Sequence, residues 1–137
     1  MTAQIFEHPS PAEHRDLEAM RSWVASITRP EQTVSVAGKL NLMTTLIDAG
    51  EVGARDPWKL AALGLLFGDA LQQAFEGRLR WVMAQDERGI SPALRWRRTD
   101  FLIYPISAIR DRITAEEPLD VHTLFAEFSR LFPFRAR

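Results

Sequence analysis

The sequence contains no cysteine, and this absence excludes several kinds of chemistry at once. Disulfide frameworks, thiol nucleophiles and metal sites held by thiolates all require that residue. Proteins of oxidising compartments often use disulfides, so the absence favours a cytoplasmic location. No membrane-spanning segment is expected, because the longest apolar run, residues 60–67, is far shorter than the roughly 20 residues that cross a bilayer.

An excess of charge of one sign is also missing. Seventeen basic side chains stand against eighteen acidic ones, which leaves a net charge of −1. A dedicated nucleic-acid-binding protein carries a clear positive excess, so we expect no nucleic-acid partner. Residues 1–9 lack the basic stretch and apolar run of a secretory signal, and we expect no membrane partner either.

What is present is typical of one globular domain. The chain has 137 residues, 46% of them hydrophobic and 26% charged. By the scaling of surface with mass, about two thirds of the surface of the unfolded chain becomes buried on folding. We therefore expect a single domain over residues 1–137, with residues 1–9 as a loosely ordered N-terminal arm.

Three helices are predicted in the first half of the chain, each from a start signal. Ser10, Pro11 and Glu13 form a capping-box pattern, so a first helix begins there. A similar pattern at residues 28–31 predicts the start of a second helix, and Gly50 marks its end.

The third predicted helix begins after Asp56, and its first half is apolar all round, which is typical of a helix at the centre of a domain. Gly64 and Gly68 lie inside it, where each glycine costs about 1 kcal/mol relative to alanine. We therefore expect another element to pack closely against them. A homodimer contact through this glycine stripe, or through Leu65 and Leu66 on an exposed side, is an alternative, so the chain is expected to be a monomer or a weak homodimer.

Beyond residue 77 the spacing of the large hydrophobic residues changes from the helical period to every second residue. Strands are predicted at residues 79–84, 94–97 and 101–104, joined by short turns. A short helix follows Pro105, and a last helix begins at Asp120. The fold class is therefore α+β, with N-terminal helices, a small three-stranded antiparallel meander and then two C-terminal helices.

The sequence carries no recognisable catalytic motif. His8, His14 and His122 lack the spacing of a metal site, and no serine lies in a nucleophile elbow. Phosphate-binding glycine loops are absent as well. We predict no catalytic, cofactor-binding or metal-binding residue and expect that the protein is not an enzyme.

Charged side chains on the predicted hairpin are the best candidates for partner binding. Asp86 and Glu87 lie at its turn, and arginines interleave with tryptophan on its strands. Exposed acids and arginines on a rigid hairpin suit electrostatic recognition of another protein. The candidate residues are Asp69, Asp86, Glu87, Arg88, Arg95, Arg97 and Arg98.

Four segments resemble a known bacterial family. They are Leu63-Gly64-x-x-Phe67-Gly68-Asp69, Trp81-Val82-x-x-x-Asp86-Glu87-x-Gly89, Phe101-Leu102-Ile103-Tyr104-Pro105-Ile106-Ser107, and Asp120-Val121 with Leu124 and Phe125. Over about residues 63–132 the chain is similar to the family called domain of unknown function 3806. The resemblance implies a small α+β protein with no assigned catalysis, so it transfers no functional residue. It makes Gly64, Gly68 and Trp81 fold-defining residues and leaves Asp69, Asp86 and Glu87 as open polar candidates.

Two functional hypotheses follow from these observations. The first is a small cytoplasmic protein-binding protein, in one version an immunity protein that neutralises a cognate bacterial toxin or effector through the hairpin. The second is a small-ligand-binding protein or enzyme with a pocket between the third helix and the sheet. That pocket requires Asp69, Arg80, Asp86 and Glu87 to converge.

Overall fold

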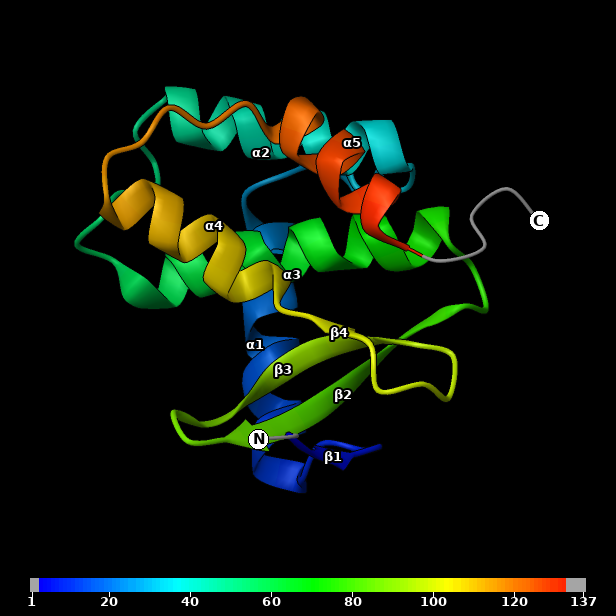
Figure 1. Cartoon of the computed structure of the whole chain (residues 1–137). Helices are drawn as coiled ribbons and strands as arrows, with labels where there is room; N and C mark the ends of the chain where they lie inside the picture. Colours follow the sequence, from blue (N-terminus) through cyan, green and yellow to red (C-terminus); the bar gives the residue numbers. More distant parts are fainter. Residues whose placement is uncertain (1–2, 133–137) are drawn as a thin grey trace.

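A computed structural model of the chain describes residues 3–132 and confirms the α+β class (Figure 1). The helices are α1 (Pro11–Ser26), α2 (Val36–Asp48), α3 (Pro57–Ala74), α4 (Pro105–Thr114) and α5 (Val121–Leu131), with a short 3-10 helix at Pro30–Gln32. The strands are β1 (Gln4–Phe6), β2 (Leu79–Asp86), β3 (Gly89–Trp96) and β4 (Leu102–Ile103), in the order β1-β2-β3-β4. Within residues 3–132, no helix is long and apolar enough to cross a membrane.

The N-terminal segment contributes a strand that sequence patterns did not predict. Residues 4–6 form β1, which pairs antiparallel with β2 in the register Ile5 to Ala84. The expected loosely ordered arm is therefore wrong for these residues, and the sheet has four strands rather than three. Three residues are too few to show a hydrophobic period, so only the pairing with β2 reveals this strand.

Side-chain caps start most of the helices where the sequence predicted them. The hydroxyl of Ser10 accepts a hydrogen bond from the Glu13 amide at 3.2 Å, and the Glu13 carboxylate accepts one from the Ser10 amide at 2.7 Å. The predicted start of α2 at residues 28–31 is wrong. In that region only the short 3-10 helix forms, and α2 begins later, at Val36, with Ser35 as its N-cap.

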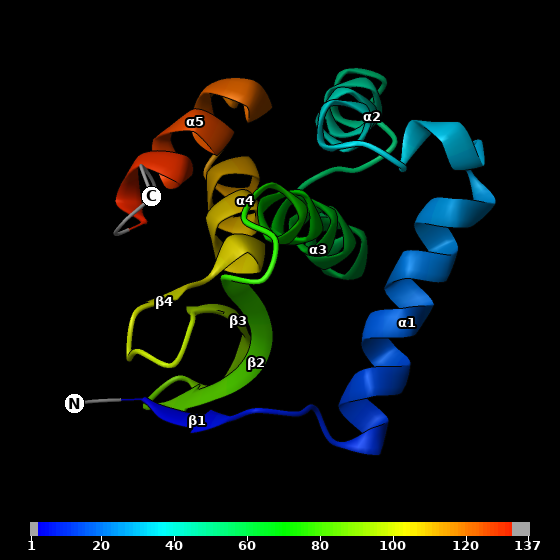
Figure 2. The same cartoon turned by 90° about the vertical axis from the view of Figure 1, so that its right-hand side faces the viewer.

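Helix α3 lies at the centre of the molecule, surrounded by α1, α2, α4 and α5 (Figure 2). Its glycines permit the close approach that the sequence predicted. A Cβ atom on Gly64 would lie 2.4 Å from the Ile106 Cα on α4, and one on Gly68 would lie 2.2 Å from the Trp81 ring on β2. Leu65 and Leu66 are buried, so the prediction that they lie on an exposed side of this helix is wrong.

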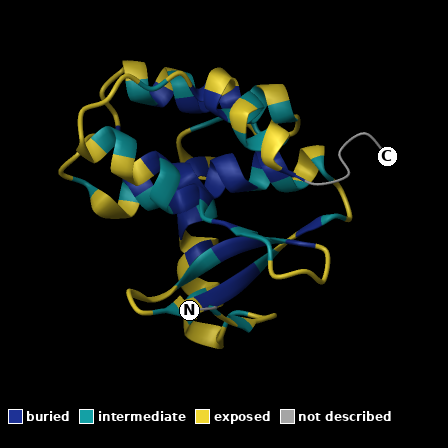
Figure 3. Ribbon diagram, in the orientation of Figure 1, coloured by how far each residue is buried: buried dark blue, intermediate teal, exposed yellow. Residues whose placement is uncertain are grey.

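The sheet carries two apolar surfaces of unequal size. The surface that faces α3 joins the main core, which gathers around α3 (Figure 3). Trp96 belongs to this core, faces inward and stacks on Phe132 at 5.5 Å between ring centroids. The opposite surface holds a small cluster of buried residues, covered by Ile5, Leu102 and Tyr104.

Candidate functional site

The structure separates the candidate residues of the hairpin into two groups. Asp86 pairs with Gly89 at the turn, whereas Leu79 pairs with Trp96 at the opposite end of the same ladder. Eight residues of strand at about 3.3 Å each place these ends about 25 Å apart. Arg97 and Arg98, which follow Trp96, therefore do not share one surface with Asp86 and Glu87.

The hairpin turn itself has a structural explanation. One carboxylate oxygen of Asp86 accepts a hydrogen bond from the Arg88 amide at 2.8 Å, as is usual for aspartate at a turn. Glu87 and Arg88 are exposed. Within residues 3–132, no ion pair joins Asp86, Glu87 or Arg88 to a charged side chain of another element.

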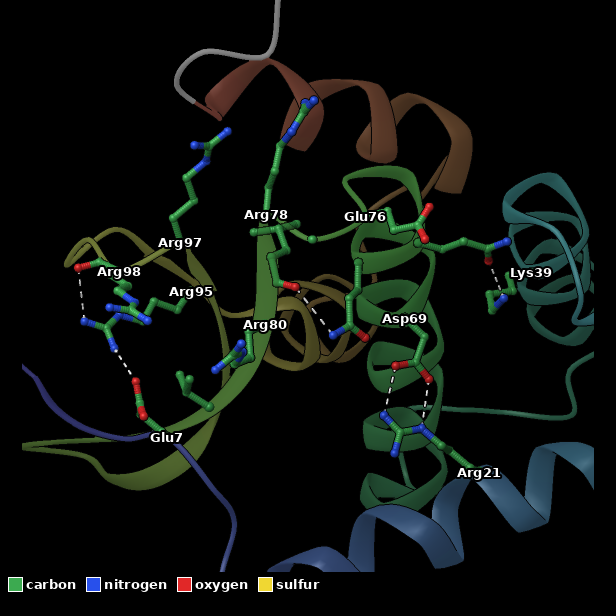
Figure 4. A pocket seen from close by; sticks show the side chains of 15 residues that line it. Glu7, Arg21, Lys39, Asp69, Glu76, Arg78, Arg80, Arg95, Arg97 and Arg98 are labelled. Carbon is green, nitrogen blue, oxygen red and sulfur yellow. Dashed lines mark hydrogen bonds and ion pairs between the residues drawn. The ribbon is translucent and has the colours of Figure 1, made fainter. Parts of the chain in front are cut away.

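The other group lines a groove of about 1010 Å³ between α3, the beginning of β2 and the end of β3 (Figure 4). Seven basic side chains and three acidic ones contribute to its lining. The basic residues are Arg21, Lys39, Arg78, Arg80, Arg95, Arg97 and Arg98, and the acidic ones are Glu7, Asp69 and Glu76. We call this surface the basic groove.

One wall of the basic groove is organised by Asp69. Its carboxylate accepts hydrogen bonds from Arg21 Nε at 3.0 Å, Arg21 Nη2 at 2.9 Å and Trp81 Nε1 at 2.9 Å. The hydrogen bonds to Asp69 raise the pKa of the Arg21 guanidinium above its ordinary value. Asp69 thus connects α1, α3 and β2, and its acceptor capacity is largely used within the fold.

Arg21 was not among the residues predicted for the site, although the sequence holds a signal for it. It follows Met20 directly and comes four residues after Leu17, so it lies beside the buried stripe of α1. A charged residue at such a position needs a partner on the element that α1 packs against. The spacing could not show that this partner is Asp69, which is 48 residues away.

Two further arginines are held in place by the turn after β3. Arg95 Nε donates to the Thr99 carbonyl at 2.7 Å, and its Nη1 lies 3.6 Å from a carboxylate oxygen of Glu7. Arg97 adopts a positive φ of 50°, and its guanidinium carbon lies 5.8 Å from the centroid of the Trp96 ring. A non-glycine residue in this conformation persists only where its surroundings hold it.

The α3 side of the groove, which holds Asp69, also carries Lys39 from α2. Its ammonium group donates to the side-chain oxygen of Gln73 on α3 at 2.5 Å. Burial lowers the pKa of Lys39 below its ordinary value of 10.5, and the charge of Asp69 opposes this change.

Arg80 is a cation of the groove that is available to a ligand. It lies directly opposite Arg95 in the β2–β3 ladder, its side chain is exposed, and no ion pair or hydrogen bond of its side chain is found within residues 3–132. Like charges directly opposite each other destabilise a sheet. Glu7 offsets part of this repulsion, and an anion bound between Arg80 and Arg95 would offset more.

The arrangement suits binding of anionic groups better than the other chemistry considered. Across residues 3–132, no cluster of three or more His, Asp or Glu side chains is placed to hold a metal ion. Among the carboxylates of the groove, Asp69 is occupied by Arg21 and Trp81, and Glu7 pairs with Arg95. Arginine, in contrast, presents a planar set of donors that matches carboxylates and phosphates.

Comparison with known proteins places the chain in a family. Residues 39–125 match the family described as a domain of unknown function (DUF3806), which is more than half of the chain. The chain belongs to the DUF3806 family. The match starts earlier than the resemblance over residues 63–132 and ends seven residues sooner. Six of the seven basic residues of the groove lie inside the DUF3806 range, and Arg21 lies outside it.

A solved structure supports the fold of this DUF3806 protein. A crystal structure from Bacteroides thetaiotaomicron VPI-5482 superposes with a TM-score of 0.75 at 15% sequence identity, over 93% of this chain. The chain spans about half the length of that protein, 47%. At this identity the likeness concerns the fold alone. No curated protein matches the chain.

Proposed function

We infer that the chain is a protein-binding module whose basic groove recognises an acidic partner. The observation that carries this inference is the pair of arginines, Arg80 and Arg95, directly opposite each other on neighbouring strands with one nearby carboxylate, Glu7. Such an arrangement is costly in the free protein and favourable once an acidic group binds. The cytoplasmic location expected from the absence of cysteine belongs to the same proposal.

The distribution of charge supports an acidic partner. The groove has four more basic side chains than acidic ones. The remaining ten basic and fifteen acidic side chains of the chain carry an excess of five acids. A positive groove on an otherwise negative molecule orients an acidic protein toward one place and repels it elsewhere.

Binding of an acidic polypeptide tests the proposal directly. A fluorescein-labelled 20-residue poly-L-glutamate is titrated with the protein, and anisotropy is recorded at low and at physiological salt. We expect saturable binding that weakens with salt and that Arg80→Glu weakens at least tenfold. Arg88→Glu makes the same change of charge at the other end of the hairpin, and it is expected to leave the affinity within threefold.

Two outcomes would overturn the basic groove as the binding site. One is the absence of binding even at low salt. The other is an equal loss of affinity in Arg80→Glu and Arg88→Glu, since the position of the charge would then be irrelevant. Tighter binding of a 20-residue single-stranded DNA than of poly-glutamate would overturn the preference for an acidic protein.

The narrower version, an immunity protein that neutralises a toxin, depends on the acidic turn rather than on the groove. It requires Asp86 and Glu87 to meet a basic surface, and it stays a prediction. The double variant Asp86→Lys and Glu87→Lys should then weaken binding to the toxin at least tenfold without lowering the melting temperature. Unchanged affinity would remove the turn from that interface.

A small anionic ligand is a second candidate, favoured by one observation. Asp69 and Arg80 both line the groove between α3 and the sheet, as the pocket hypothesis requires, whereas Asp86 and Glu87 lie at the distant turn. Titration calorimetry with inorganic phosphate and with citrate distinguishes the candidates. One-to-one binding tighter than about 1 mM that Arg80→Gln abolishes would favour the small ligand.

A further inference from the structure

The first half of β2 has an edge that no strand covers within residues 3–132. The ladder between β1 and β2 ends where Phe6 pairs with Met83, and β1 is the outermost strand of the sheet. Beyond that point, residues 79–82 of β2 face the basic groove, and Leu79, Arg80 and Val82 line it. Figure 4 shows this stretch of β2, which carries Arg80, running between Arg95 on β3 and Asp69 on α3.

The backbone groups of two residues point from this edge into the groove. Asp86 and Gly89 close a two-residue turn, so the two residues exchange backbone hydrogen bonds. Every second residue of β2, counted back from Asp86, therefore points its backbone groups toward β3, and the residues between them point theirs toward β1. Leu79 and Trp81 alternate in step with Met83, so their backbone groups point to the same side of β2, away from β3. The amide of the Gln72 side chain lies 3.5 Å from the Leu79 carbonyl, which confirms that this carbonyl points away from β3.

We propose that an extended acidic segment of the partner adds to this edge as a strand, antiparallel to β2 and in line with β1. The proposal rests on the proposed function and specifies how the groove binds its partner. Main-chain hydrogen bonds to Trp81 and Leu79 would supply affinity, with the added strand taking the place of the Gln72 side chain at the Leu79 carbonyl. Side chains on alternate positions would supply specificity. Four residues of strand span about 13 Å of the groove.

The register determines where acidic side chains of the added strand belong. Residues opposite Arg80 and Val82 direct their side chains to the face that carries Arg80 and Arg95, because directly opposed residues share a face of the sheet. Residues opposite Trp81 direct theirs toward α3. An alternation of acidic and apolar residues therefore matches the site.

A second copy of this chain is a poorer occupant of the same edge. Antiparallel pairing of two β2 edges would bring the two Arg80 side chains close together across the new ladder. Repulsion between them disfavours self-association, as charged side chains do on many natural edge strands. The same charge attracts an acidic strand.

Backbone methylation separates strand addition from simple charge attraction. The probe is an acetylated, fluorescein-labelled octapeptide of alternating valine and glutamate. Two analogues carry N-methyl groups on every valine nitrogen or on every glutamate nitrogen, with identical charge. When glutamates lie opposite Arg80 and Val82, the valine amides point to β2 and the glutamate amides point away.

We expect methylation of the valine nitrogens to weaken binding at least tenfold and methylation of the glutamate nitrogens to change it less than threefold. Arg80→Glu should weaken binding of the parent octapeptide at least tenfold, and Arg88→Glu should not. Equal affinities for the two methylated analogues would overturn strand addition. So would a failure of the octapeptide to bind when poly-glutamate does. In either case the proposed function survives, because the titrations with poly-glutamate test it separately.

Discussion

Asp69 illustrates how one side chain can connect distant parts of this fold. It receives hydrogen bonds from Arg21 on α1 and from Trp81 on β2, and its own side chain is only 18% exposed. These contacts hold α1 and β2 against the two sides of α3. A residue that was a candidate for partner binding therefore has a mainly structural role.

Asp69→Asn is expected to lower the free energy of unfolding by about 1–3 kcal/mol. One oxygen of Asp69, Oδ1, accepts from both Arg21 Nη2 and Trp81 Nε1, and the amide oxygen of asparagine could replace it. The amide nitrogen cannot replace Oδ2, which accepts from Arg21 Nε, and the negative charge opposite Arg21 is lost. The lower part of this range is expected, since the Arg21 side chain is 38% exposed and water replaces part of what is lost. Urea unfolding measures the change.

Asp100→Asn provides a matched control for that experiment. Asp100 is exposed in the turn before β4, with no ion pair or hydrogen bond of its side chain found among the described residues. The same substitution there should change stability by less than about 0.5 kcal/mol. Equal effects of the two substitutions would show that Asp69 does not connect the elements.

Tyr104 offers a titration that reports on the small cluster behind the sheet. Burial, helped by the charge of Asp86, raises the pKa of Tyr104 above its ordinary value of 10.0, although Arg88 opposes the change. It is the only tyrosine of the chain, so absorbance at 295 nm follows it alone. The folded protein should titrate above pH 10, and the protein in urea near pH 10.

A raised pKa of an acid also predicts how stability changes with pH. The unfolded state loses the Tyr104 proton first, so the contribution of Tyr104 to stability is complete below pH 10 and falls as pH rises through the folded pKa. Tyr104→Phe should remove this part of the alkaline decline. An unchanged decline in Tyr104→Phe would contradict the assignment.

At the scale of elements, α3 determines how the other parts approach one another. Its two glycines lie under Ile106 of α4 and Trp81 of β2, so neighbouring elements come closer than side chains on α3 would permit. Because Trp81 sits on Gly68 and donates to Asp69, one turn of α3 positions the strand that borders the basic groove. Packing of α3 and geometry of the site are thus linked.

Gly64→Ala is expected to destabilise the protein by about 1–2 kcal/mol, although alanine favours helices by about 1 kcal/mol. The new Cβ would meet a backbone atom, the Ile106 Cα, which cannot rotate away. Gly53→Ala is the control, because a Cβ there meets nothing within 4 Å. Denaturation that shows Gly64→Ala to be as stable as Gly53→Ala would disprove the close contact.

For the whole molecule, the short strand β1 has a large effect on the sheet. Strand β1 covers half of the β2 edge and places Ile5 over the small cluster of Val82, Ala84 and Ala93. The other half of the edge stays open in the basic groove. The division of β2 into a covered and an open half therefore depends on where β1 ends.

Removal of residues 1–6 is expected to lower stability by about 1–3 kcal/mol and to promote association. It would uncover the cluster behind the sheet and leave the whole β2 edge unpaired, while Glu7 stays available to Arg95. Thermal unfolding and light scattering at increasing concentration measure the two effects. An unchanged melting temperature together with a monomer at high concentration would contradict this role of β1.

Most elements of this fold could be predicted from local sequence. Caps such as Ser10 and Asp120 bond to amides three residues ahead, and the hydrophobic period belongs to a single helix or strand. The close packing at Gly64 and Gly68 followed from the same local patterns. Such signals involve residues only a few positions apart, so they can be recognised in the amino-acid sequence without knowledge of the tertiary structure.

The tertiary structure alone decided the site. Glu7 reaches Arg95, and Arg21 reaches Asp69 across 48 residues, because separate elements pack side by side. Strand β1 forms only because an edge of β2 is there to pair with it. The sequence by itself determined the elements and the arginines, while packing between elements decided which arginines lie opposite each other and where the edge of the sheet stays open.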